Sequence, residues 1–348
     1  MADSEYMIID GDGHIEEHDI EIWEYLDAPI KNGIKDGPNF PFFPTLDGYQ
    51  RDYFRAATGG HPGYVGADEW ISFMDETRIE STVLYPTAGL SVGMIQDPDW
   101  AILMCRAYND WFRDRYSRKS ARLRGVALLP LQDVDEAVKE LRRSVTELGM
   151  VAAMLPANSA DMGLRKPLGD KDFWPIYAEA QRLNCPLAVH GAPSLGLGTN
   201  FLNRTEAVLL EHPLAQIIQA SSMLMSGMFD EFPTLRVAYL EADTGWMPYL
   251  VDRLTGRARE GVTDPIDVLT SGRVFLSCQS GERSLRYAID RFGPEVVLYA
   301  SDYWHETPAE IVEDIEILRS RADLSDDEKR NIFRNNTIRF YELEEALA

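Results

Sequence analysis

The sequence predicts a single α/β domain of 348 residues, a (β/α)8 TIM barrel with long insertions in the loops that follow its strands. Eight short apolar runs recur along the chain, and amphipathic segments follow most of them. Alternating strands and helices indicate a parallel sheet, and eight such units close into a barrel. An open doubly wound sheet is the alternative, although no G-x-G-x-x-G motif follows the first apolar run.

The expected strands are mostly apolar, as strands buried on both faces of a parallel sheet are. They cover residues 7–9, 81–85, 125–129, 151–155, 186–189, 236–240, 274–277 and 296–300. The expected helices follow amphipathic patterns and cover residues 100–116, 134–148, 173–183, 214–229 and 284–292. A last helix is expected at about 325–345, because Ser325 can cap it and acidic residues 326–328 favour its first turn.

Two segments are longer than ordinary barrel loops. Residues 28–68 are rich in Gly, Pro and aromatic side chains, and residues 191–212 form a second long stretch that contains Gly. Both follow strands, at the end of a barrel where active sites form. We expect these insertions to act as lids, substrate walls or dimer contacts within one domain spanning residues 1–348.

Composition narrows the class of protein. The formal net charge is −23, which argues against nucleic acid or an anionic membrane surface as a partner. No apolar run approaches the roughly 20 residues of a membrane-spanning helix. The acidic N-terminus lacks the order of a signal peptide, and Cys105 and Cys185 lie in apolar surroundings typical of buried, reduced thiols. We therefore expect a cytoplasmic protein that acts on a small molecule.

Residues that can bind a metal follow four of the expected strands. Asp12 and His14 follow the first, His190 the fifth, Glu241 the sixth, and Asp302 with His305 the eighth. Side chains two apart on a strand point the same way, and the ends of parallel strands meet at one mouth of a barrel. Charged groups at buried strand ends are costly unless they are paired or bind a metal. A mixed Asp/His set suits Zn²⁺, Mn²⁺ or Fe²⁺.

Each residue also has a simpler interpretation. Asp-x-Asp-x-His alone is more often a turn, and it cannot begin a calcium loop because Ile15 stands where that loop needs Gly. A single His after a strand is usually structural, and Ser-Asp can cap a helix. The joint placement at several strand ends favours the metal site. His18, His61 and His212 are interpreted as mostly structural, although His212 lies near an expected helix start that can reach the mouth.

An ordered set of motifs extends over nearly the whole chain. They are IDGDGH at 9–14, FMDETRI at 73–79, VLYP at 83–86, AYND at 107–110, LLP at 128–130, VHG at 189–191, GMFDEFP at 227–233, YLEA at 239–242, GW at 245–246, ASDY at 300–303 and NTIRFY at 336–341. With this set the chain resembles the amidohydrolase-related metal enzymes typified by aminocarboxymuconate-semialdehyde decarboxylase and γ-resorcylate decarboxylase. The resemblance implies a metal-dependent TIM barrel, and a homodimer.

The resemblance also implies a ligand set. It makes Asp12, His14, His190 and Asp302 the ligands of one divalent ion, for which we expect Zn²⁺, with Mn²⁺ or Fe²⁺ as alternatives. The family often has His-x-His or Glu-x-His at the first position, so Asp12 differs from that pattern. The decarboxylases carry a catalytic His at the end of strand six, where this chain has Glu241.

The first expectation for function is non-oxidative decarboxylation of a small aromatic or unsaturated carboxylic acid. Asp302 would be the acid that protonates a ring or enol carbon, and His305 or Glu241 would tune or relay the proton. Arg51, Arg55 and Arg204 could hold a second anionic group or lie plainly on the surface, and Trp304 could line the pocket.

Two alternatives stay open. A metal-dependent hydrolase or hydratase would use an activated water on an amide, a lactone or a carbon–carbon bond, and Glu241 in place of the family His makes it a serious competitor. A non-enzymatic scaffold on an inherited barrel would bind no metal.

Overall fold

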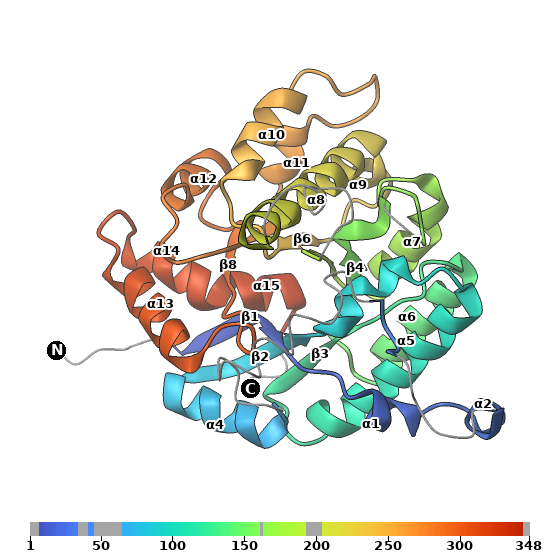
Figure 1. Cartoon of the computed structure of the whole chain (residues 1–348). Helices are drawn as coiled ribbons and strands as arrows, with labels where there is room; N and C mark the ends of the chain where they lie inside the picture. Colours follow the sequence, from blue (N-terminus) through green and yellow to red (C-terminus); the bar gives the residue numbers. More distant parts are fainter. Residues whose placement is uncertain (1–6, 34–40, 45–64, 161–162, 193–203, 344–348) are drawn as a thin grey trace.

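The computed structural model describes residues 7–33, 41–44, 65–160, 163–192 and 204–343. Within these residues, eight parallel strands follow one another around one sheet in the order of the sequence (Figure 1). The strands are β1 (Ile8–His14), β2 (Ile79–Tyr85), β3 (Leu123–Ala127), β4 (Ala152–Pro156), β5 (Leu187–His190), β6 (Val237–Leu240), β7 (Val274–Cys278) and β8 (Val297–Tyr299). This is the predicted (β/α)8 barrel, and each strand overlaps a predicted one.

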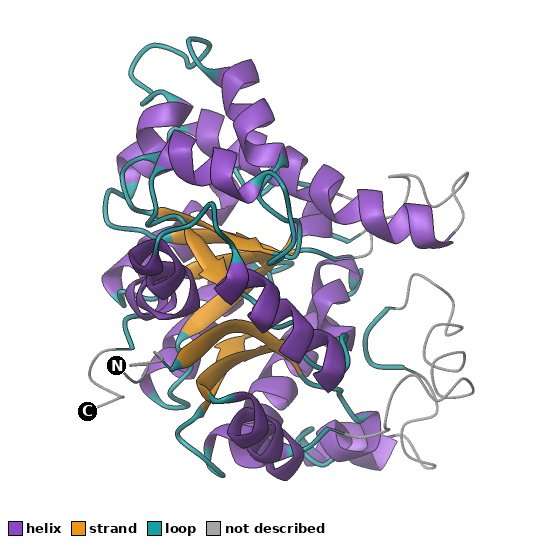
Figure 2. Ribbon diagram, turned by 90° about the vertical axis from the view of Figure 1, so that its left-hand side faces the viewer, coloured by secondary structure: helices purple, strands orange, loops and turns teal. Residues whose placement is uncertain are grey.

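Helices enclose the strands (Figure 2). The α-helices are α1 (Asp19–Trp23), α2 (Ala28–Gly33), α4 (Ala67–Thr77), α5 (Pro98–Phe112), α6 (Val134–Thr146), α7 (Trp174–Arg182), α8 (Arg204–Ser226), α9 (Met228–Glu231), α10 (Trp246–Leu254), α11 (Pro265–Leu269), α12 (Leu285–Phe292), α13 (Pro308–Ser320), α14 (Asp326–Arg330) and α15 (Asn336–Tyr341). Short 3-10 helices cover Ala88–Met94, Ala157–Ala160 and Lys171–Phe173, and π-helical turns cover Arg113–Ser117 and Asn331–Asn335. None of the helices in the described ranges is both long and apolar enough to cross a membrane.

Strand β1 is longer than predicted. It continues past the apolar run to His14, which pairs with Tyr85 of β2. The close approach of neighbouring groups explains the glycine at position 13, because a Cβ there would lie 2.4 Å from Cη2 of Trp70. The polar end of β1 is therefore part of the barrel wall, and it carries Asp12 and His14 in fixed strand geometry.

Hydrogen bonds join the first strand to the chain that follows the last one. The Asp302 N–H donates to the Asp12 carbonyl over 3.0 Å, and the His14 N–H donates to the Tyr303 carbonyl over 2.7 Å. These bonds lie at the carboxyl ends of β1 and β8. They bring the first and last predicted metal ligands to the same point of the rim.

The insertions differ in part from the prediction. Helix α8 begins at Arg204 and not at residue 214, so residues 204–212 of the second predicted insertion are helical. The helix also continues through Pro213, which sequence reasoning placed near a helix start because proline is usual in the first turn. In the first insertion, residues 28–33 form α2 and residues 67–68 begin α4, and residues 34–40 and 45–64 lie outside the described part of the chain.

The C-terminal helices contact the chain where β1, β6 and β8 begin, at the end of the barrel away from the predicted ligands. They extend from Asp326 to Tyr341, with the Asn331–Asn335 π turn between them, and end where Glu342 takes a left-handed conformation with φ 54°. This end precedes the predicted residue 345. The Tyr341 hydroxyl donates to the Gly11 carbonyl over 2.7 Å, which anchors α15 to β1.

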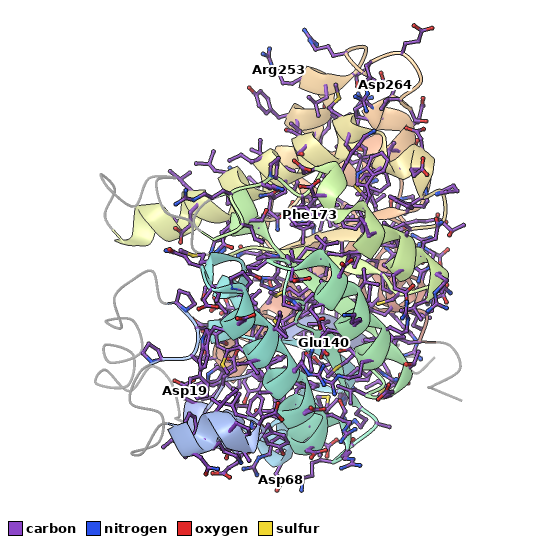
Figure 3. All side chains as sticks on the ribbon, turned by 90° about the vertical axis from the view of Figure 1, so that its right-hand side faces the viewer. Asp19, Asp68, Glu140, Phe173, Arg253 and Asp264 are labelled. Carbon is purple, nitrogen blue, oxygen red and sulfur yellow. The ribbon has the colours of Figure 1, made fainter. Side chains whose placement is uncertain are left out.

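A buried amide connects the outer helices to the sheet. The Asn109 side chain on α5 accepts a hydrogen bond from the Leu128 N–H and donates to the Leu128 carbonyl, both over 2.9 Å. It also donates to Glu140 of α6 over 2.7 Å (Glu140 is labelled in Figure 3). Asp110 pairs with Arg143 over 2.7 Å. The AYND motif therefore has a structural role in joining α5, α6 and the chain after β3.

Removal of the Asn109 amide tests this role. Asn109→Ala leaves a buried N–H and a buried carbonyl of Leu128 without their partner. We expect the free energy of unfolding to fall by about 2–4 kcal/mol, measured by urea denaturation. Asn335→Ala, at an exposed helical position, is the matched control and should change stability by less than about 0.5 kcal/mol. Equal effects of the two substitutions would contradict the assignment.

Candidate metal centre

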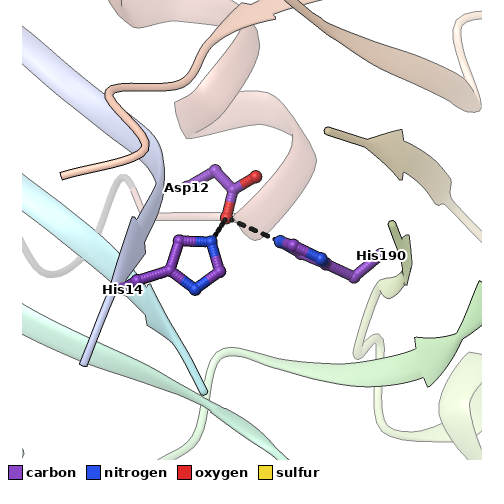
Figure 4. A group of neighbouring side chains, drawn as sticks. All are labelled: Asp12, His14 and His190. Carbon is purple, nitrogen blue, oxygen red and sulfur yellow. Dashed lines mark hydrogen bonds and ion pairs between the residues drawn. The ribbon is translucent and has the colours of Figure 1, made fainter. Parts of the chain in front are cut away.

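Three predicted ligands meet at the carboxyl ends of β1 and β5. Oδ1 of Asp12 lies 3.2 Å from Nε2 of His190 and 3.6 Å from Nε2 of His14 (Figure 4). All three side chains are almost completely buried. Asp302, which follows β8, places Oδ1 3.4 Å from Nε2 of His14. The structure thus brings together the four residues predicted as ligands.

The backbone fixes which nitrogen of each imidazole faces this cluster. Nδ1 of His14 lies 2.8 Å from the Pro86 carbonyl, and Nδ1 of His190 lies 2.7 Å from the Gly191 carbonyl. A carbonyl oxygen can only accept a hydrogen bond, so Nδ1 carries the proton in both rings. Each Nε2 is then directed into the cluster, and Nε2 of His14 is buried without a hydrogen-bond partner among the described residues. This tautomer is the one in which histidine binds metals.

Neighbouring donor atoms of the cluster are spaced like two ligands of one divalent ion. Neighbouring ligand atoms bonded to Zn²⁺ at about 2.1 Å are about 3.0 Å apart at right angles and about 3.4 Å apart at the tetrahedral angle. The separations within the cluster are 3.2, 3.4 and 3.6 Å. Groups of ligand atoms that could hold an ion are formed by Asp12, His14 and His190 and by His14, Asp302 and His305.

Burial and neighbouring charges move the histidine pKa values in opposite directions. Burial, and then the nearby His305, lower the pKa of His14 to about 3, so this ring is neutral and can donate a lone pair. Burial also opposes the charged form of His190, but Asp12 and then Glu241 outweigh it and raise the pKa of His190 to about 9. The cluster therefore attracts a positive charge beside Asp12.

Asp10 holds the ends of three strands in place from behind the cluster. Its carboxylate accepts hydrogen bonds from the Thr82 hydroxyl on β2 over 2.7 Å and from the Ser301 N–H and hydroxyl after β8, both over 2.8 Å. Burial raises the pKa of Asp10 to about 6, although these hydrogen bonds favour its charged form. Since Ser301 immediately precedes Asp302, Asp10 helps to hold this predicted ligand in place.

Glu241 lies beside the cluster, on the Nδ1 side of His190. Its Oε2 is 3.3 Å from Nδ1 of His190 and 3.6 Å from Nδ1 of His212 on α8. Its Oε1 is 4.0 Å from Nδ1 of His305. A Cβ at position 191 would come within 3.1 Å of Oε2, so the glycine of the VHG motif makes room for this carboxylate. Glu241 can orient imidazoles, and it belongs to neither group of candidate ligands among the described residues.

His305 contacts Asp302 in the cluster and Thr87 in the loop that follows β2. Its Nδ1 is 2.9 Å from Oδ1 of Asp302, and its Nε2 is 3.0 Å from the Thr87 hydroxyl. Its ring stacks on that of His14, with the centroids 3.9 Å apart and the planes inclined by 24°. Trp304, between the two site residues, is buried and has a φ of 97°, a strained backbone conformation for a bulky side chain.

Three predicted substrate-binding residues cannot be placed. Arg51 and Arg55 lie outside the described residues, and Arg204 is the first residue of α8, with a side chain that the structure does not describe. Sequence reasoning missed the roles of Asp10, Thr87 and His212. The alternation of β1 already placed Asp10 on the same face as Asp12, whereas no sequence signal singled out Thr87.

Comparisons with known proteins agree with this geometry. The model of a protein family described as Amidohydrolase matches residues 9–343. The γ-resorcylate decarboxylase of Rhodococcus jostii is 29% identical over 303 residues, which cover 80% of this chain and 88% of that protein. The 2-amino-3-carboxymuconate-6-semialdehyde decarboxylase of Dictyostelium discoideum is 23% identical over 288 residues, covering 80% and 77% of the two chains.

Solved structures share the fold. The dihydroxybenzoic acid decarboxylase of Polaromonas sp. JS666, with bound manganese and the inhibitor 2-nitroresorcinol, superposes with a TM-score of 0.75. The match covers 98% of this chain and 99% of that one, at 22% sequence identity. The likeness confirms the barrel over essentially the full length of both chains.

The support that Asp10 gives to the cluster can be tested by substitution. Asp10→Ala leaves the buried N–H of Ser301 unpaired and should lower the free energy of unfolding by about 1–3 kcal/mol, measured by denaturation. The metal content, measured by elemental analysis, should also fall, because Ser301 would no longer hold the neighbouring Asp302 in place. Asp10→Asn keeps one oxygen and lets the two hydroxyls accept from its amide, so it should restore most of both quantities. Wild-type stability and metal content in Asp10→Ala would disprove this role.

Proposed function

The chain belongs to the amidohydrolase family, and on that premise we propose that it is a metal-dependent, non-oxidative decarboxylase of small aromatic or unsaturated carboxylic acids. One observation carries the proposal: Asp12, His14 and His190 converge at ligand spacing with Nε2 of both histidines directed into the cluster, and Asp302 lies 3.4 Å from Nε2 of His14. The relatives described above that share this family are decarboxylases of such acids. Decarboxylation also needs an acid beside the ion, and the 3.4 Å distance between Oδ1 of Asp302 and Nε2 of His14 supports giving Asp302 this role.

We assign the four residues to one divalent ion. When bound, the ion supplies positive charge that binds the substrate carboxylate and a neighbouring oxygen. Two imidazoles and two carboxylates suit Zn²⁺, with Mn²⁺ or Fe²⁺ as alternatives. In this proposal the protein is a cytoplasmic homodimer, as its composition and family lead us to expect.

The reaction needs one proton transfer and one bond cleavage. In the proposal, Asp302 gives its proton to the ring or enol carbon that bears the carboxylate. The bond between this carbon and the carboxylate then breaks, carbon dioxide leaves, and the electron pair returns to the ring or enol system. Glu241 and His305, which lie next to each other beside the cluster, are proposed to tune the acidity of Asp302 through their charges.

The remaining predicted residues are assigned to substrate binding. Trp304 lies between Asp302 and His305 in the chain and is proposed to contact the ring of the substrate. Arg51, Arg55 and Arg204 are proposed to hold a second anionic group. The three arginines belong to the insertions at residues 28–68 and 191–212, which follow strands, where barrel enzymes select their substrates.

Carbon dioxide release tests the function directly. Metal-loaded protein should release carbon dioxide from at least one member of a panel of hydroxybenzoates, and in D₂O the product should carry deuterium at the former carboxylate position. Chelation should stop the release, and added Zn²⁺ or Mn²⁺ should restore it. Asp302→Asn should lower kcat by about 10²- to 10⁴-fold, because it removes the acid.

The control makes the same change, Asp to Asn, at a position far from the site. Asp110→Asn alters a carboxylate that pairs with Arg143 on the outer helices, and it should leave kcat within about twofold. A chain that hydrolyses lactones or amides and releases no carbon dioxide would be a hydrolase, the function that Glu241 in place of the family His favours. A metal-loaded chain inactive on both panels would contradict both functions.

A further inference from the structure

We propose that the outer face of helix α8, formed by Leu210, Leu214, Ile217, Ile218 and Ser221, binds a second copy of this chain. The two α8 helices pair antiparallel across a two-fold axis. The inference rests on the homodimer included in the proposed function and names the surface that forms it. It follows from the composition of α8, from the contacts that fix its rotation and from the spacing of its outward side chains.

Helix α8 lacks the charged outer side of an ordinary barrel helix. From Leu209 to Ser226, Glu211 is the only Asp, Glu, Lys or Arg residue, and it is buried. Helix α6, by contrast, exposes charged side chains at positions 135, 139 and 142. A helix that is apolar on all sides is normally buried. We infer that a partner covers the outer face of α8.

Hydrogen bonds fix the rotation of α8 on the barrel. Nε2 of Gln216 donates to the Val189 carbonyl over 2.9 Å and to the Leu240 carbonyl over 2.8 Å, at the ends of β5 and β6. Nε2 of Gln219 donates to the Ala157 carbonyl over 2.7 Å. These bonds attach one side of the helix to the barrel, so the opposite side points away from it. Figure 3 shows α8, in yellow, extending beyond the barrel.

The outward side of α8 exposes large apolar side chains. The exposed fractions are 46% for Leu210, 40% for Leu214 and 39% for Ile218, and 69% for the adjacent Leu209. Contiguous apolar surface marks a site of contact, whereas single exposed residues need no explanation. A membrane surface is a poor fit, because interfacial helices carry Lys or Arg on their polar side and α8 has neither between residues 209 and 226.

The charge of the chain favours a second copy as the occupant. With a formal net charge of −23, two copies repel one another over most of their surfaces. The repulsion is weakest where neither copy carries charge, and the outer face of α8 is such a place. A basic protein would bind through acidic side chains, which this face lacks. Two-fold pairing of identical surfaces is also the commonest way in which soluble chains associate.

The outward positions repeat with the spacing of a coiled-coil seam. Leu210, Leu214, Ile217 and Ser221 follow one another at intervals of four, three and four residues. In an antiparallel pair centred between positions 214 and 217, Leu214 packs on the partner subunit's Ile217. Leu210, a large side chain, then packs over the partner subunit's Ser221, a small one. The Ser221 hydroxyl donates to the Ile217 carbonyl of its own helix over 2.6 Å, so its burial leaves no donor unpaired.

The interface lies behind the candidate metal centre. The side of α8 that faces the barrel carries His212, whose Nδ1 is 3.6 Å from Oε2 of Glu241. It also carries Gln216, which bonds the carbonyl of Val189, the residue before His190. The second copy therefore holds in place a helix that contacts the strand ends of the site.

A charge placed at the centre of the interface tests the surface. The mass of the particle is measured by light scattering after gel filtration. The wild type should have the mass of two chains. Leu214→Glu should have the mass of one, with a dissociation constant raised by about 100-fold or more, because pairing would bury a carboxylate against apolar side chains. Ile317→Glu on α13 is the matched control, since Ile317 is 39% exposed and lies outside the proposed interface, and it should remain a dimer.

Mixing two variants tests the antiparallel pairing. Ile217→Lys should be monomeric for the same reason as Leu214→Glu, and urea denaturation should show that both chains are folded. An equal mixture should form a particle of two chains, because the introduced carboxylate of one faces the introduced ammonium of the other, while the second pair of positions stays as in the wild type.

The outcomes separate the interface from the enzyme. A Leu214→Glu chain that stays dimeric would overturn the surface, and two folded monomers that do not associate on mixing would overturn the antiparallel pairing. A monomeric wild type would overturn the second copy altogether. Each of these results leaves the decarboxylase standing, because carbon dioxide release and metal content are measured independently of the mass.

Discussion

The buried carboxylate of Asp10 is the constraint on which the geometry of the site depends. It joins β1 to Thr82 on β2 and to Ser301 after β8. A barrel holds each strand by its neighbours, but the first and last strands come from opposite ends of the chain and need such a connection at the rim. Because Asp12 and His14 follow Asp10 on the same strand and Asp302 follows Ser301, one carboxylate helps to set the distance between predicted ligands that are almost three hundred residues apart.

The imidazoles are oriented by a second set of contacts, made almost entirely by loop backbone. Carbonyls of Pro86 and Gly191 hold Nδ1 of His14 and His190, and the Thr87 hydroxyl holds Nε2 of His305. Each contact leaves one nitrogen directed into the cluster. Ring orientation is thus settled before an ion binds, and this lowers the cost of assembling the ligands. Glu241 adds negative charge beside Nδ1 of His190 and Nδ1 of His305.

The barrel, and the meeting of Asp12, His14 and His190 at one rim, could be predicted because each depends on local patterns. Alternation along β1 placed Asp12 and His14 on one face, and the strand-end positions of His190 and Asp302 follow from the rule that parallel strands end at one mouth. The beginning of α8 could not be predicted, because a helix that continues through Pro213 contradicts local propensity and depends on tertiary packing. The hydrogen-bond partners of His14 and His190 could not be predicted either, since every residue has a backbone carbonyl and the sequence does not show which one a side chain will meet. The roles of Arg51, Arg55, Arg204 and Trp304 remain predictions.

The central claim is that one divalent ion binds where β1, β5 and β8 end. Anomalous diffraction from crystals of the Zn²⁺-loaded chain, recorded on both sides of the zinc edge, tests it most directly. The account predicts one strong peak for each chain within bonding distance of Nε2 of His14, bordered by Asp12, His190 and Asp302. The absence of a peak there, or a peak only at the protein surface, would contradict the account.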